Sequence, residues 1–126
     1  MSLERDGAIA EVASYLSLLS PTPSKPLDLH TLEVSASKTI KIAIADIEKL
    51  GAATADYHQR NYERTREIGA AVNFLGYDGL IVPSARWKCD NLVIFSDNHG
   101  LAEKLEKVAV EQIDWQAWAR DNGMLG

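Results

Sequence analysis

Polar side chains able to bind a ligand gather in a short insert between two apolar runs. Residues 76–95 read GYDGLIVPSARWKCDNLVIF, and the insert carries Ser84, Arg86 and, at its far end, Asn91. A turn needs Gly, Pro or Asn, but it does not need a serine and an arginine. Pro83 stiffens the backbone where the first run ends. The Ser84 and Asn91 side chains could therefore converge at one end of a sheet, where ligand pockets are common. The residues alone leave a plain hairpin and a pocket equally open.

A second candidate for chemistry is the carboxylate of Glu11. It is the one acidic side chain inside the apolar helical stretch of DGAIAEVASYL, and its neighbours Ile9 and Val12 place it at the flank of the apolar face. Such a glutamate either reaches solvent or is partly buried and oriented by hydrogen bonds. The second state is the one expected of a catalytic carboxylate. Both interpretations stay open at this point.

Several other chemistries are disfavoured by the sequence. Ser84 sits in VPSAR and lacks the G-x-S-x-G elbow of a serine hydrolase. His30, His58, His99 and Cys89 show no CxxC or HExxH spacing, so no metal site is expected. The single cysteine has no activating partner close in sequence and is interpreted as a structural or surface thiol. No glycine-rich phosphate loop is present.

Composition and charge limit the class of protein. The chain has 126 residues, of which 46% are hydrophobic and 25% charged, and this favours one folded domain over residues 1–126. Its net charge of −5 disfavours direct binding of nucleic acid. No apolar run approaches the roughly 20 residues of a membrane span. The start lacks the pattern of a signal peptide, and one cysteine suits a reducing compartment, so a cytoplasmic location is expected.

Hydrophobic spacing indicates which elements position the candidate residues in the first half. Ile9, Val12, Leu16 and Leu19 predict a helix over 6–20 with Asp6 as its N-cap. The pattern then predicts a proline-rich loop over 21–26 and a strand over 27–36. Residues 38–46 are predicted to form a second strand or a short strand that enters a turn, and a short helix with a loop is expected over 47–61.

The clearest helix is predicted over 61–79, with Gly76 as its stop. One face carries Tyr62, Thr65, Ile68, Gly69, Val72 and Leu75. GLIVP and NLVIF are predicted strands, a turn or short helix and a further strand follow within 97–113, and a short helix closes the chain. Trp115 and Trp118 in that helix are typical of a core, and a surface for a partner helix is the alternative. The order of elements predicts an α+β fold.

With these residues in view, the chain resembles the RES domain family, named for its Arg, Glu and Ser. The match is strongest over 61–98, through the segments DGLIVPSAR and NLVIF, and DGAIAEVA resembles the helix that holds the family glutamate. By this resemblance, Glu11 corresponds to the family glutamate and Ser84 to the family serine, both as catalytic residues. Asn91 matches a polar position at the start of the next strand. Asn91 and the adjacent Arg86 are the implied substrate-binding residues.

The resemblance implies an ADP-ribosyltransferase-like mixed sheet with flanking helices. It also implies a toxin that consumes NAD as its substrate, without a separate cofactor, by cleaving the bond to nicotinamide. Phosphate, water or a protein would accept the ADP-ribose. The expected protein partner is an Xre-type antitoxin, and a homodimer is also open. A non-catalytic interaction domain that still binds an antitoxin is the alternative function.

One departure from the family pattern concerns the start of the chain. The family's arginine and a pocket tyrosine usually precede the glutamate helix, whereas only ten residues precede Glu11 here and Arg5 lies too close to it. The resemblance therefore leads us to expect either a fragment or a divergent form that lacks this segment. Such a form would lack one wall of the pocket and an anchor for the NAD phosphates.

Overall fold

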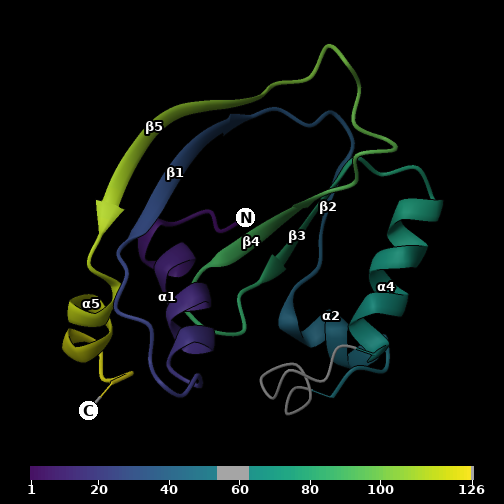
Figure 1. The fold of residues 1–126 in the computed structure, drawn as a ribbon. Helices are drawn as coiled ribbons and strands as arrows, with labels where there is room; N and C mark the ends of the chain where they lie inside the picture. Colours follow the sequence, from purple (N-terminus) through teal and green to yellow (C-terminus); the bar gives the residue numbers. More distant parts are fainter. Residues whose placement is uncertain (54–62, 126) are drawn as a thin grey trace.

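Helices flank two small β-sheets in the computed structural model, which describes residues 1–53 and 63–125. This arrangement confirms the predicted α+β class (Figure 1). The elements in chain order are α1 (Arg5–Leu16), β1 (Leu27–Val34), β2 (Thr39–Lys41), α2 (Ile44–Lys49), α4 (Glu63–Phe74), β3 (Gly79–Pro83), β4 (Asp90–Ile94), β5 (Leu105–Ile113) and α5 (Trp115–Asp121).

The strands pair in two separate groups. β1 and β5 form an antiparallel pair that joins distant parts of the chain, with Leu27 opposite Ile113. The second sheet has the order β2-β3-β4, in which β2 runs parallel to β3 and β4 runs antiparallel to it. β3 and β4 are consecutive, and Val82 pairs with Asn91. The backbone of the polar insert, residues 84–89, is therefore a hairpin connection between β3 and β4. Whether the insert also forms part of a pocket depends on where its side chains lie.

Each sheet has a hydrophobic cluster of its own. The first core joins α1, β5 and α5 through Ile9, Ala13, Ile113, Trp115 and Ala119. The second core joins α2, α4 and β3 through Ile42, Ile47, Ala52, Val72 and Leu80. Figure 1 shows the same division, with α1 and α5 together at one side and α2 and α4 together at the other.

A buried carboxylate fixes the start of the second sheet. Asp78, only 2% exposed, accepts hydrogen bonds from the backbone N–H groups of Ser37 (2.8 Å) and Lys38 (2.9 Å) and from the Ser37 hydroxyl (3.2 Å). Its backbone carbonyl accepts from Phe95 at 3.0 Å. One aspartate thus holds the entry to β2 and the exit of β4 beside the start of β3.

Two boundaries in the first half differ from the sequence prediction. α1 has Glu4 as its N-cap instead of Asp6, because residues 1–3 run extended beside β4 and the helix begins directly after them. The helix also ends at Leu16 instead of residue 20. Of the two interpretations of 38–46, the short strand that enters a turn is confirmed. β2 ends at Lys41, and the chain turns into α2, where Asp46 accepts a hydrogen bond from the Ala43 N–H.

Most predicted elements of the second half are confirmed. α4 ends where Gly76 adopts a φ of +86°, a conformation that suits glycine. Its predicted apolar face is only partly buried, since Val72 lies in the core while Leu75 is 63% exposed, and Tyr62 falls outside the described residues. Trp115 is fully buried, which confirms the core interpretation for that residue. No helix within residues 1–53 and 63–125 is long and apolar enough to cross a membrane.

Candidate functional site

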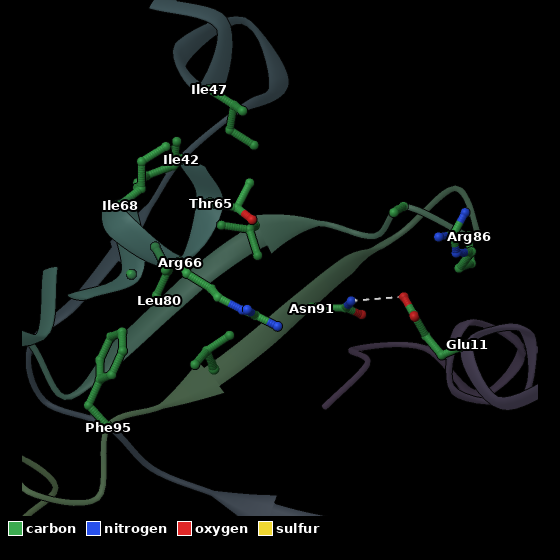
Figure 2. A pocket seen from close by; sticks show the side chains of 14 residues that line it. Glu11, Ile42, Ile47, Thr65, Arg66, Ile68, Leu80, Arg86, Asn91 and Phe95 are labelled. Atoms are coloured by element: carbon green, nitrogen blue, oxygen red, sulfur yellow. Dashed lines mark hydrogen bonds between the residues drawn. The ribbon is translucent and has the colours of Figure 1, made fainter. Parts of the chain in front are cut away.

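Glu11 meets two of the three candidate residues of the insert, Ser84 and Asn91. Its Oε1 atom accepts a hydrogen bond of 2.7 Å from the Ser84 hydroxyl and one of 3.1 Å from Asn91 Nδ2. Figure 2 shows the second of these bonds as a dashed line between the start of β4 and the side of α1. The predicted convergence of Ser84 and Asn91 is confirmed, and of the two states open to Glu11 the structure has the oriented one.

The Ser84 hydroxyl also organises the insert. It accepts hydrogen bonds from the backbone N–H groups of Arg86 (3.1 Å) and Trp87 (3.3 Å), and the Ser84 N–H donates to the Cys89 carbonyl at 2.8 Å. Ser84 is only 6% exposed. Because a hydroxyl has one proton, which here points at Glu11, the geometry suits a residue that fixes the carboxylate better than a nucleophile.

The first residues of the chain bring α1 to this end of the sheet. They run antiparallel to β4, where the Leu3 N–H donates to the Asp90 carbonyl at 2.9 Å and the Leu92 N–H donates to the Met1 carbonyl at 2.7 Å. Ser2 lies opposite Asn91. α1 follows directly, and this pairing therefore sets Glu11 at the height of Asn91.

Gly7 permits the close approach of α1 to the insert. A Cβ atom at Gly7 would overlap both Ser2 Oγ and Cys89 Sγ, which themselves lie 3.4 Å apart. Only glycine leaves room for both atoms without a shift of the helix. Cys89 is a free thiol packed at this contact, in agreement with a structural thiol.

α5 supports the insert from another direction. The Trp87 ring packs on the Trp118 ring with centroids 5.3 Å apart, and Trp118 Nε1 donates to Asp6 Oδ1 at 3.2 Å. Asp6, predicted as a helix cap, thus binds a tryptophan instead. α1, the insert and α5 are joined in a closed set of contacts, which fixes where Glu11 lies relative to Ser84.

A pocket of about 400 Å³ opens beside the Glu11–Ser84–Asn91 group. Five polar residues line it (Figure 2): Glu11, Arg86 and Asn91 at one end, Arg66 of α4 between that end and the apolar side chains, and Thr65, also of α4. The apolar part comes mainly from the second core and its neighbours, through Ile42, Ile47, Ile68, Leu80, Val82 and Phe95. The volume falls in the range typical of small-molecule sites.

Asn91 offers this pocket an acceptor. Its Oδ1 atom is buried and receives no hydrogen bond from any side chain or backbone group in the described parts of the chain. Since Nδ2 is engaged by Glu11, the opposite atom of the amide must be the oxygen. Buried acceptors are nearly always satisfied, and a donor group on a bound ligand would satisfy this one.

Within residues 1–53 and 63–125, neither a metal cluster nor a serine–histidine pair is found. The described residues contain no group of three His, Cys, Asp or Glu side chains placed to hold a metal ion, and His58 lies outside them. His99 Nε2 lies 2.7 Å from the Ser35 carbonyl oxygen, whereas Ser84 is bonded to Glu11. The sequence-based rejection of a Ser–His–Asp triad agrees with these partners.

Three pocket residues were missed by the sequence analysis as site residues. Thr65, Arg66 and Gly69 of α4 line the pocket. Thr65 and Gly69 belong to the face of the helix that the sequence analysis identified. Residues that line a pocket recur at the same helical spacing as residues that pack in a core, so the spacing did not distinguish the two. Arg66 directly follows Thr65 at the side of that face, and this cation beside an apolar face was the available signal.

The structure therefore defines the class of protein as an α+β domain with a pocket, and at the edge of this pocket a carboxylate is held by two hydrogen-bond donors. The RES domain family model matches residues 1–118, and the chain belongs to the RES domain family. No curated protein and no solved structure matches the chain.

Proposed function

We propose that this domain consumes NAD by cleaving the bond between nicotinamide and ribose. The observation that carries the proposal is the Glu11 carboxylate, fixed by Ser84 and Asn91 at the edge of a pocket that also contains Arg86. Membership of the RES family supports the choice of substrate, because the resemblance to that family implies NAD degradation.

The proposed reaction needs no covalent nucleophile on the protein. The electron pair of the C–N bond leaves with nicotinamide, which becomes neutral, and the ribose C1′ develops positive charge. An acceptor oxygen, from phosphate, water or a protein side chain, then bonds to C1′ and gives up its proton if it carries one. A carboxylate fixed beside C1′ stabilises the developing charge more than it stabilises the ground state.

Each candidate residue has a distinct role in this proposal. Glu11 is the catalytic residue and faces the ribose. Ser84 is a positioning residue, because its proton is used to hold Glu11. Asn91 offers its free Oδ1 to a ribose hydroxyl or to the carboxamide N–H of nicotinamide. Arg86 lines the same end of the pocket and supplies a guanidinium fork for a phosphate oxygen.

The biological setting belongs to the same proposal. Uncontrolled loss of NAD would be toxic to a cell, so we propose that the domain is a cytoplasmic toxin neutralised by an Xre-type antitoxin. The rival proposal is a RES-fold domain that binds such a partner without turnover. Measurable turnover of NAD distinguishes the two.

The test follows nicotinamide release from NAD, with and without phosphate. We expect release by the wild type and a loss of at least about 100-fold in Glu11→Gln, which keeps an acceptor for Ser84 and Asn91 but removes the charge. Glu106→Gln, at an exposed position on β5, is the matched control and should retain full activity. Release that survives Glu11→Gln would reject the site. No release from the wild type, together with binding of an antitoxin, would favour the non-catalytic rival.

A further inference from the structure

One wall of the pocket is made by α4, and the proposed cleavage of NAD uses none of the residues of that wall. Three α4 residues, Thr65, Arg66 and Gly69, face the pocket along with Ile68. In Figure 2 the Arg66 side chain extends toward Asn91 and lies between the apolar group around Ile68, Leu80 and Phe95 and the Glu11–Asn91 pair. The pocket therefore has a polar end, where the Glu11 carboxylate lies with Arg86 and Asn91, and an apolar part with Arg66 at its entrance.

Gly69 leaves the apolar part open. It lies inside a helix, where glycine is less stable than alanine, and a Cβ atom added there would meet no atom within 4 Å. Packing with the rest of the described chain therefore does not require glycine at this position. Because the side chain is missing, the backbone of α4 at Gly69 is open to the pocket, and a planar ring can approach it closely.

NAD has two rings, nicotinamide and adenine, and their charges indicate which of them fits the apolar part of the pocket. The nicotinamide ring of NAD carries a positive charge, so Arg66 at the entrance of the apolar part disfavours the ring there, whereas the other end offers it the Glu11 carboxylate, with Arg86 beside it. Adenine is neutral, and in NAD it is followed by a ribose and two phosphates. Arg66 is exposed and is suited to pair with one of those phosphates.

We propose that the α4 wall binds the adenosine diphosphate half of the substrate, with the adenine ring over Gly69 and a phosphate at Arg66. This inference rests on the proposed function for the identity of the substrate. The chemistry that it recognises is a neutral heteroaromatic ring joined to a diphosphate. Gly69 and Arg66 are in this proposal residues that determine specificity, not catalytic residues.

The test is a titration with ADP, which has the ring and the diphosphate but no bond to cleave, beside a titration with nicotinamide mononucleotide. Gly69→Leu fills the apolar part, and Ala70→Leu places the same side chain at the next, exposed position of α4 as its control. Arg66→Gln removes the cation, and Arg120→Gln does the same at an exposed position of α5. Circular dichroism establishes that each variant is folded.

We expect Gly69→Leu and Arg66→Gln each to weaken ADP binding at least about tenfold, with nicotinamide mononucleotide changed less than threefold and both controls unchanged. Absence of ADP binding by the wild type would overturn the inference. An equal loss of ADP affinity in Ala70→Leu, or an equal loss of affinity for nicotinamide mononucleotide in Gly69→Leu and Arg66→Gln, would also overturn it.

The two proposals can fail separately. ADP binding that depends on Gly69 and Arg66 in a protein that releases no nicotinamide would uphold this inference and reject the proposed function. Nicotinamide release with the same KM for NAD in all four variants would uphold the proposed function and overturn this inference.

Discussion

Glu11 and Ser84 are 73 positions apart in the chain, and the Ser84 hydroxyl donates a hydrogen bond of 2.7 Å to the Glu11 carboxylate. The two residues come from different halves of the molecule, because α1 packs in the first core and β3 in the second. The same oxygen of Glu11 accepts from Asn91. The orientation of this carboxylate therefore depends on tertiary contacts on both sides, which suggests four further experiments.

Ser84→Ala tests the difference between positioning and catalysis. The change removes a donor to Glu11 and leaves the N–H groups of Arg86 and Trp87 without their acceptor, so we expect a loss of about 1–3 kcal/mol in the free energy of unfolding. Nicotinamide release should fall about tenfold, less than in Glu11→Gln, and Ser84→Thr should restore part of it. Urea unfolding and initial rates measure the two effects. An unchanged stability with activity as low as in Glu11→Gln would show that Ser84 is itself catalytic.

Asn91→Asp tests the electrostatics of the pair. It is nearly isosteric, but it replaces a donor 3.1 Å from Glu11 by a second carboxylate. Since two carboxylates at this distance repel each other strongly, we expect Asn91→Asp to lower nicotinamide release at neutral pH about tenfold more than Asn91→Ala. Rates of the two variants, measured side by side, provide the comparison. Equal rates would mean that the added charge does not disturb Glu11 and would contradict the assigned contact between the two side chains.

Gly7→Ala tests the approach of α1 to the insert. The added methyl group would overlap Ser2 Oγ and Cys89 Sγ, and overpacking of this kind costs about 1–3 kcal/mol. The cost should shrink when the same change is made in a Ser2→Gly/Cys89→Ala background. Gly100→Ala is the control, since a Cβ atom there would lie at an ordinary 3.7 Å from Glu103. A cost that is the same in both backgrounds would contradict the assigned overlap.

Asp78 should make stability depend on acid pH. Burial acts most strongly on this carboxyl and opposes its ionisation, but the hydrogen bonds from Ser37 and Lys38 together outweigh it and hold the pKa of Asp78 below its ordinary 3.8. A carboxyl with a depressed pKa stabilises the fold fully above its unfolded-state pKa, and this stability is lost as the pH falls through the folded-state value.

We therefore expect Asp78→Asn to be less stable than the wild type at pH 7 and to lose less stability between pH 5 and pH 2. Urea unfolding at a series of pH values measures this, with the exposed Asp28→Asn as control. Identical pH profiles for Asp78→Asn and the wild type would show that the carboxylate charge has no part in holding β2.

The sequence was sufficient for most elements and for the residues that meet at Glu11. Alternating and helical spacing predicted β1, α4, β3, β4 and β5, since each is long enough or flanked clearly enough for its period to be recognised. The family resemblance singled out Glu11 and Ser84, and spacing placed Ser84 and Asn91 at neighbouring strand ends. The exact boundaries of α1 and β2 were not predictable, because they depend on pairing with β4 and on a single Asp46 hydrogen bond.

The α4 wall shows where sequence patterns are ambiguous. Thr65, Ile68, Gly69 and Val72 recur at helical spacing, but only Val72 is buried in the core, and the other three line the pocket. Spacing reports which residues share a face and does not report what that face covers. The separation into two sheets with two cores was likewise unpredictable, because strand partners are chosen by contacts between distant residues.

The placement of Glu11 between two cores has a consequence for heat inactivation. Opening fluctuations that move the first core away from the second would break the bonds from Ser84 and Asn91 while leaving every helix and strand intact. Activity would then be lost at a lower temperature than ellipticity. The proposed activity would be lost when the two cores separate, and amide hydrogens near residues 1–3 and the insert would exchange with solvent before those of either core.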